Sequence, residues 1–190
     1  MRVKKKVTFP DQGGIRFFYP GSVILVSAVD ARGRADICTV GAWALVNGEP
    51  PMFGIAMCTT ALGSRYWKRY TTRCIEETGE FVINIPDSQL RRAWQVCGSV
   101  SLVHQPDADK FALAGLTPQP ATRVRAPLIA ECPVNIECRV HARLALPTHD
   151  WIVGEPVACH MAEDVVSGQR KLDWDSAPVL RDLTRAAPPP

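Results

Sequence analysis

A series of short apolar runs, rich in β-branched residues and separated by turn residues, constrains the fold of this chain most. The first run, 22–29 (SVILVSAV), stops at a turn signal over 30–33 and resumes over 35–40. Runs of this length and composition are typical of buried strands, and the turn between them predicts a hairpin. The proline pair at 50–51 then precedes a further short strand over 52–58.

The next segment carries the signals of a helix followed by a strand. Thr71 or Thr72 can cap a helix whose body is 73–77, and Gly79 stands where a left-handed residue ends many helices. A strand over 80–85 follows at once. The pattern therefore predicts a helix followed directly by a strand.

A second helix and a long connection come next. Asp87 can cap a helix in which apolar residues recur along one face, and Gly98 is expected to close it. The segment 105–127 is rich in proline and predicts an irregular connection with one helical turn over 109–114. Long loops in compact domains more often have a function than lack one.

Two long strands are predicted near the C-terminal end, over 128–146 with a break at Pro133 and over 151–162. Six or so strands with few helices indicate a mainly β fold, a predominantly antiparallel barrel with helical inserts. Period-2 alternation in the first long strand predicts that one face is exposed. Apolar Val134, Ile136, Cys138 and Val140 alternate there with polar Asn135, Glu137, Arg139 and His141.

Composition and charge exclude several classes of protein. The chain has 190 residues, of which 46% are hydrophobic, so one globular domain can bury its own core. The net charge of +3 is spread along the chain, which argues against a nucleic-acid partner. The N-terminal stretch lacks the apolar core of a secretory signal, and no apolar stretch is long enough to cross a membrane. Seven cysteines without a Cys-x-x-Cys pair favour reduced thiols and a cytoplasmic location.

The chain lacks the motifs of a Rossmann dinucleotide site, a P-loop, a nucleophile elbow and a zinc protease. Its four histidines lie in separate segments without the spacing of metal ligands, so no metal site is predicted. His149 is the histidine that most invites a functional interpretation, because it lies in a polar break between two strands. There it could donate a hydrogen bond to a ligand or supply a proton near neutral pH.

Arg69, Tyr70 and Thr71 form the most suggestive anion site, because they stand at the start of the first predicted helix. A helix N-terminus offers N–H groups and a positive dipole end, and an arginine can bind phosphate with two hydrogen bonds. The alternative is that Thr71 is a plain helix cap and Arg69 a solvated charge. Cys97, beside Gly98, is either another buried thiol or a residue next to a ligand.

Several stretches, read in order, carry a family resemblance. They are 19–27 (YPGSVILVS), 36–43 (DICTVGAW) with 50–52 (PPM), 69–71 (RYT) with 77–86 (ETGEFVINIP), 97–98 (CG), 109–118 (DKFALAGLTP), and 126–138 (APLIAECPVNIEC) followed by His149, Asp150 and 152–155 (IVGE). In order and spacing the chain resembles the flavin reductase-like, FMN-binding split-barrel family, in particular its flavoredoxin-like branch.

This resemblance implies a homodimer of six-stranded antiparallel split barrels of Greek-key type, with FMN bound non-covalently near the dimer interface. It implies an oxidoreductase in which NADH or NADPH reduces the flavin and the electrons pass to an acceptor or a partner protein. The barrel domain would span 17–183, between an N-terminal extension, 1–16, and a disordered proline-rich tail, 184–190. The alternative is a non-catalytic flavin carrier or sensor, or a barrel that binds no cofactor.

The resemblance also assigns roles to residues. His149 is the expected catalytic residue on the reactive side of the flavin, and a longer connection than usual before Arg69 leaves Arg65 as an alternative phosphate ligand. The segment 99–105 departs from the family pattern on the substrate side. The expected cofactor-binding residues are Thr39, Val40, Gly41, Ala42 and Trp43 along the ring, Arg69, Tyr70 and Thr71 at the phosphate, and Cys97, Gly98 and Lys110.

Overall fold

The computed structural model of the chain describes residues 21–61 and 66–166. The predicted N-terminal extension, 1–16, and the predicted proline-rich tail, 184–190, lie outside the described residues. So does Arg65, the alternative phosphate ligand. The domain bounds, 17–183, therefore stay a prediction.

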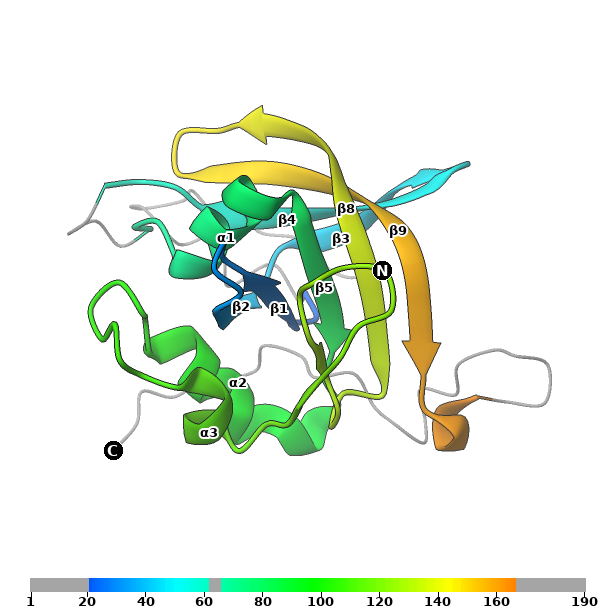
Figure 1. The fold of residues 1–190 in the computed structure, drawn as a ribbon. Coiled ribbons are helices and arrows are strands. Elements are labelled where there is room, and N and C mark those ends of the chain that lie inside the picture. The colour runs from blue at the N-terminus through cyan, green and yellow to red at the C-terminus, as the bar shows by residue number, and fades with distance from the viewer. Residues whose placement is uncertain (1–20, 62–65, 167–190) are drawn as a thin grey trace, which may run out of the picture.

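A seven-stranded antiparallel sheet dominates the structure, in the order β2-β1-β5-β8-β9-β4-β3 (Figure 1). The prediction of a mainly β, antiparallel fold is confirmed, with one strand more than expected. The additional strand, β3, has a sequence of mixed polarity that no periodic pattern marks. The strands are β1 (Ile24–Val29), β2 (Ala35–Val40), β3 (Trp43–Gly48), β4 (Pro51–Cys58), β5 (Glu80–Ile85), β8 (Val134–Ala145) and β9 (His149–Met161), with a small separate pair, β6 (Pro118–Gln119) and β7 (Leu128–Ile129).

The predicted first hairpin is confirmed: β1 and β2 pair antiparallel from Ile24 opposite Val40 to Val29 opposite Ala35. Gly33 has a φ of 86° in the turn, a conformation that glycine adopts without steric cost. β1 is an interior strand of the sheet, because it pairs with β5 as well as with β2, and all of its residues are buried. Its continuous apolar composition is the reason that it can occupy the interior of the sheet.

The sheet has two edge strands, β2 and β3, and these edges are consecutive in the chain. A two-residue link, Gly41 and Ala42, joins the end of β2 to the start of β3. The amide of Ala56 on β4 donates to the Ala42 carbonyl oxygen at 2.9 Å, which holds the link against the sheet. The link therefore brings the two ends of the sheet order together.

Helix α1 (Tyr70–Thr78) begins differently from the prediction. Its N-cap residue is Arg69, whose side chain makes no capping hydrogen bond, while Thr71 and Thr72 lie buried inside the first turn. The predicted threonine cap is wrong, because both hydroxyls bond to other elements. The predicted helix end is confirmed, since Gly79 is left-handed with a φ of 67° and its N–H bonds to the Ile75 carbonyl oxygen.

Helices α2 (Arg91–Ser99) and α3 (Lys110–Ala114) lie together near one end of the sheet (Figure 1). Asp87 caps a short 3-10 helix, Ser88–Leu90, that leads into α2, so the predicted cap is confirmed one turn before the α-helix. Gly98 lies inside α2, not beyond its end as predicted. A Cβ at Gly98 would approach the Thr39 hydroxyl oxygen to 3.2 Å, so glycine permits α2 to pack closely on β2.

The two halves of β8 differ in burial. Residues 134–138 are all buried, including Asn135 and Glu137, whereas residues 141–145 are all exposed. The prediction of an exposed polar face is therefore wrong for the first half. The chain over 121–129 packs on that face and supplies polar partners: the Asn135 side chain donates to the carbonyl oxygen of Ile129 at 3.0 Å.

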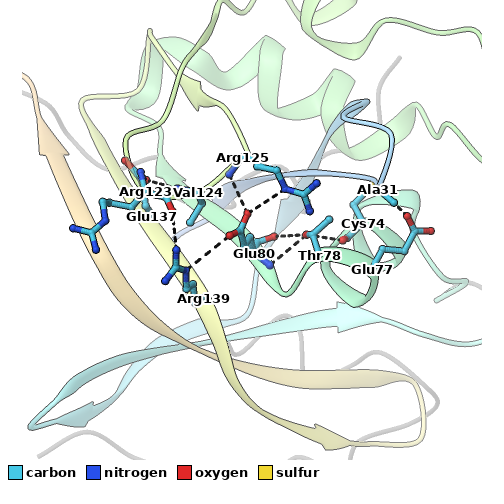
Figure 2. A network of polar contacts seen from close by, with 10 residues as sticks. All are labelled: Ala31, Cys74, Glu77, Thr78, Glu80, Arg123, Val124, Arg125, Glu137 and Arg139. Atoms are coloured by element: carbon cyan, nitrogen blue, oxygen red, sulfur yellow. Dashed lines mark hydrogen bonds and ion pairs between the residues drawn. The ribbon is translucent and has the colours of Figure 1, made fainter.

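Glu137 is the centre of this covering contact (Figure 2). Its carboxylate accepts from the backbone N–H groups of Thr122, Arg123 and Val124 at 2.6 to 3.0 Å, and also from the Thr122 hydroxyl at 2.8 Å. His160 Nε2 lies 2.6 Å from the same carboxylate. Burial raises the pKa of Glu137, but these hydrogen bonds outweigh it and lower the pKa to about 2.

The main core lies between the sheet and α1 and includes Ile24, Phe81 and Ile152. Gly154 on β9 permits Phe81 to pack there, because a Cβ at residue 154 would stand 2.4 Å from the Phe81 ring. A second cluster, between β2 and helices α2 and α3, contains Ile37, Cys97 and Phe111. The two cores together fix α1, α2 and α3 relative to the sheet edge.

Candidate functional site

The segment 39–43, expected along the ring of a flavin, runs from the end of β2 through the two-residue link to the start of β3. Thr39 donates from its hydroxyl to the Trp94 carbonyl oxygen of α2 at 2.7 Å, and Val40 is buried. Trp43 donates from its ring nitrogen to the Ser22 hydroxyl at 3.2 Å. These contacts fix both ends of the segment.

The middle of this segment is open. Gly41 is exposed, and among residues 21–61 and 66–166 a Cβ there would meet only a Val23 methyl carbon, at 4.0 Å. Because β2 and β3 are edge strands, part of their backbone N–H and C=O groups points away from the sheet. Such groups can donate to and accept from a planar heterocycle placed against the link.

Arg69 stands at the N-terminus of α1, as predicted. Its guanidinium lies 4.4 Å from the ring centre of Trp67, and Trp67 meets the His104 ring edge-on at 4.6 Å. Trp67 and His104 are residues that the sequence did not indicate, because they come from connections 37 positions apart (104 − 67) with no shared motif. The contact is a cation–π interaction that orients the arginine.

The hydroxyls of the two residues after Arg69 point into the fold. The Tyr70 hydroxyl donates to Asp30 at 2.8 Å, and the Thr71 hydroxyl donates to Asp36 at 2.6 Å. Thr71 is fully buried. The role of Tyr70 and Thr71 as phosphate ligands stays a prediction, and their side-chain oxygens already have partners in the protein.

Lys110 is buried at the start of α3 and reaches β2. Its ammonium group lies 3.0 Å from the Asp36 carboxylate and also contacts the Ile37 carbonyl oxygen. Asp36 thus joins three elements, β2, α1 through Thr71 and α3 through Lys110. The expected contact of Lys110 with a flavin stays a prediction, since its described contacts are with β2.

The cysteines nearest to this cluster are buried. Burial raises the pKa of Cys38 to about 11, against the opposing effect of Lys110, and raises the pKa of Cys97 to about 12. Cys97 belongs to the core between α2 and β2. Its expected place next to a ligand stays a prediction, and its thiol is protonated at neutral pH.

His149, the expected catalytic residue, is the first residue of β9 and is half-buried. Its Nε2 lies 3.3 Å from Cys58 Sγ, and its Nδ1 lies 2.8 Å from the Thr148 hydroxyl oxygen. The ring of Tyr66 stands against the imidazole, with 5.1 Å between ring centres. Tyr66 and Trp67, next to each other in the chain, therefore contact His149 and Arg69, respectively.

Within 21–61 and 66–166, no three His, Cys, Asp or Glu side chains gather as a metal ion would require. In the same ranges, no helix has the length and apolar character needed to cross a membrane.

Comparison with known families decides the identity of the fold. Residues 16–177 match the flavin reductase like domain family. The chain belongs to this family. Membership supports a flavin-related oxidoreductase role, and the expected family resemblance is confirmed over most of the chain.

Solved structures agree with this family assignment. A flavoredoxin from Methanosarcina acetivorans is 30% identical, with 94% of this chain and 86% of that chain covered and a TM-score of 0.76. The flavoredoxin of Desulfovibrio vulgaris (Miyazaki F) is 26% identical, with 93% and 89% covered and a TM-score of 0.75. An FMN-binding protein from Thermus thermophilus, 16% identical with 90% and 87% covered and a TM-score of 0.72, shares the fold. The predicted split-barrel architecture is thus confirmed.

Two features of the described residues suit a flavin mononucleotide. Arg69 and the α1 N-terminus, which no side chain caps, form a donor set suited to a phosphate. The open link at Gly41 and Ala42 offers backbone groups and lacks large side chains, as a planar ring requires.

Proposed function

We propose that the chain binds FMN non-covalently and catalyses electron transfer from NADH or NADPH to an acceptor or partner protein. The observation that carries this proposal is the position of Arg69 at the uncapped N-terminus of α1, in a barrel whose edge link is open. Membership of the flavin reductase like family supports a flavin as the cofactor. The structure from Thermus thermophilus, which is named as an FMN-binding protein, supports FMN as the form of that flavin.

In this proposal the chain's residues position the cofactor and tune its surroundings. Arg69 binds the phosphate, held in place by the ring of Trp67, and the 39–43 segment lies along the isoalloxazine. FMN supplies the hydride-accepting chemistry when it is bound. His149 stands on the reactive side and holds a proton on its ring, with Thr148 fixing its orientation through Nδ1.

Replacement of Arg69 tests the phosphate site. We expect Arg69→Ala to weaken FMN binding more than tenfold, because a charged hydrogen bond contributes about 1.5 to 3 kcal/mol. Arg73→Ala is the matched control, since it removes one exposed arginine from the same helix. Titration of the apoprotein with FMN, followed by flavin fluorescence, measures both. Equal affinities in the two variants would contradict the assignment of the phosphate to Arg69.

The nicotinamide step has its own test. Anaerobic mixing of the FMN-loaded protein with NADH or NADPH is expected to bleach the visible absorbance of the oxidised flavin. Bleaching with one of them identifies the donor. A spectrum unchanged by both would favour the non-catalytic carrier or sensor, while a protein that is colourless and takes up no FMN would reject flavin binding altogether.

We also propose that the chain is a homodimer with FMN near the interface. The outer parts of two hairpins, β3–β4 and β8–β9, project from the body of the sheet (Figure 1). Apolar side chains are exposed on both hairpins. They are Leu45, Val46, Leu144 and Leu146. Such side chains favour association, because burial of each removes apolar surface from water.

Light scattering after size exclusion tests the dimer. Leu144→Asp is expected to convert a dimer to a monomer, because it would place a charge in an apolar contact. Leu113→Asp is the matched control, since Leu113 is 51% exposed on α3, away from both hairpins. A wild-type protein that is monomeric, or a Leu144→Asp variant that remains dimeric, would contradict this interface.

A further inference from the structure

Cys58 differs from the other cysteines of the chain in its surroundings. It is the last residue of β4, half-buried, and pairs across the sheet with His149, the first residue of β9. Its Sγ lies 3.3 Å from His149 Nε2. This is the distance at which a thiol can pass its proton to an imidazole.

The described contacts of the imidazole suit its protonated form. Nδ1 lies 2.8 Å from the Thr148 hydroxyl oxygen, and the Tyr66 ring stands 5.1 Å from the imidazole centre. A protonated imidazole is a donor at both ring nitrogens, so it finds an acceptor in the Thr148 oxygen and another in a thiolate at Cys58. The ring of Tyr66 adds attraction for the positive charge.

The backbone on both sides of the pair is fixed. The Thr72 hydroxyl of α1 donates to the Cys58 carbonyl oxygen at 3.2 Å, and the Thr59 amide donates to the Thr148 carbonyl oxygen at 3.1 Å. The two strand ends are therefore tied to each other and to α1. The thiol and the imidazole are held in reach of each other by the sheet register itself.

Charged groups on the neighbouring elements are engaged with one another. Arg143 of β8 lies 2.8 Å from Glu76 of α1 and also contacts Asp150 of β9, and Lys68 contacts the same Glu76. These four groups form a chain of alternating charge beside the pair. His149 Nε2 is in direct contact with the Cys58 sulfur.

The described contacts of the six other thiols include no histidine within hydrogen-bond distance. Burial raises the pKa of Cys38, Cys74, Cys97, Cys132, Cys138 and Cys159 above the ordinary cysteine value, and five of these six are buried in the fold. Cys159 is the exposed member of the group, on β9. It provides an internal reference with solvent access.

We propose that Cys58 and His149 form a nucleophilic thiol site that reacts with soft electrophiles, hydroperoxides above all. His149 takes the thiol proton, and the Cys58 thiolate attacks one peroxide oxygen. The O–O bond breaks, and the leaving hydroxide or alkoxide takes the proton from His149 to become water or an alcohol. Cys58 is oxidised by two electrons to the sulfenic acid, the peroxide is reduced, and an added thiol can restore the cysteine.

Alkylation with iodoacetamide tests the nucleophile without any cofactor or electron transfer. The folded protein is alkylated briefly across a range of pH, and peptide mass spectrometry measures the rate at each cysteine. At pH 6, Cys58 is expected to react about tenfold or more faster than Cys159, because the paired thiolate persists below the ordinary thiol pKa of about 8.5. Equal rates at the two cysteines would overturn the proposal.

Two variants distinguish activation of Cys58 by His149 from an effect of solvent exposure alone. In His149→Asn the rate at Cys58 is expected to fall about tenfold at pH 6 and to follow the pH profile of an ordinary thiol. Thr148→Val removes the Nδ1 partner at an exposed position and is expected to act in the same direction, less strongly. Should His149→Asn not fold, judged by circular dichroism, Thr148→Val decides. An unchanged Cys58 profile in a folded variant would overturn the pair.

Hydrogen peroxide followed by dimedone tests the oxidation step. Dimedone traps sulfenic acids, so wild-type Cys58 is expected to carry the adduct at peroxide concentrations that leave Cys159 unlabelled. Cys58→Ser is expected to lose the label altogether. Labelling of Cys159 to the same extent as Cys58 would overturn the assignment of the peroxide chemistry to the pair.

Discussion

The two halves of β8 belong to one continuous strand and yet stand in opposite environments. Residues 134–138 are covered on both faces, and the covering chain is fastened by the Glu137 carboxylate (Figure 2). Residues 141–145 are exposed on both faces and carry Leu144 at 59% exposure. The difference shows that the polarity of the side chains along a strand does not decide their burial here. Hydrogen-bond partners decide it, because a polar side chain with every hydrogen bond satisfied can be buried.

Arg139 and Glu80 mark the boundary between the halves. Glu80 lies between Arg139 and Arg125, 3.7 to 3.8 Å from their guanidinium nitrogens, and both arginine side chains are 55% exposed. Figure 2 shows this triad beside the Glu137 contact. Exposed ion pairs of this kind contribute about 0 to 1 kcal/mol each. The buried carboxylate is therefore expected to dominate the stability of the covered half.

Glu137→Ala is the substitution expected to have the largest effect. It leaves the N–H groups of Thr122, Arg123 and Val124 without their acceptor. The Val124 N–H is buried, and an unsatisfied buried donor costs about 1 to 3 kcal/mol, while each lost hydrogen bond to a charged group costs about 1.5 to 3 kcal/mol. We expect a loss of at least about 3 kcal/mol in the free energy of unfolding, measured with urea. A loss below 1 kcal/mol, about the value of one exposed ion pair, would remove the distinction drawn between the two halves.

The same carboxylate predicts a dependence on acid. Because the pKa of Glu137 is about 2 in the folded chain and 4.5 is its ordinary value, its contribution to stability is complete above the ordinary value. It is lost progressively as the pH falls from about 4.5 towards about 2, since protonation removes an acceptor from the donors. Urea midpoints of wild type and Glu137→Gln between pH 5 and pH 2 should converge. Parallel curves would contradict the low pKa.

A matched pair of alanine substitutions compares the two halves of β8 directly. One of them is expected to change the free energy of unfolding least among these predictions. Ile136→Ala, in the covered half, is expected to cost about 2 to 5 kcal/mol, as is usual for a buried aliphatic side chain. Leu144→Ala is expected to change the free energy of unfolding by less than about 0.5 kcal/mol at a protein concentration too low for association. Comparable losses in the two variants would show that Leu144 is buried within the single chain.

Local signals in the sequence predicted local structure well. The β1–β2 turn and the glycine end of α1 depend on backbone preferences of a few neighbouring residues, and both are confirmed. A break between the last two strands was also predicted, but the structure confines it to residues 146–148 and places His149 and Asp150 within β9. The mainly β fold followed from the number of such strands and from the family resemblance.

Contacts between distant segments account for what the sequence did not predict. Thr71 is a good cap residue by local preference, but Asp36, 35 positions away, takes its hydroxyl. The burial of Glu137 depends on a connection that carries no periodic pattern. In the candidate site, Arg69 was identified from a local motif, whereas its stacking partner Trp67 and the contact of Trp67 with His104 required the folded chain.

The buried contact of Asp36 with Lys110 and Thr71 has a consequence for how the chain finds its fold. Side chains alternate between the faces of a strand, so a slip of β2 by one residue against β1 would turn Asp36 to the opposite face. Lys110 would then keep a buried charge without its counter-ion, an arrangement that is strongly destabilising. Apolar residues such as Ile37 and Val40 would tolerate neighbouring registers far better. The loss of this buried ion pair, more than a poorer fit of side chains, thus destabilises misaligned registers of β2, the strand that leads into the candidate site.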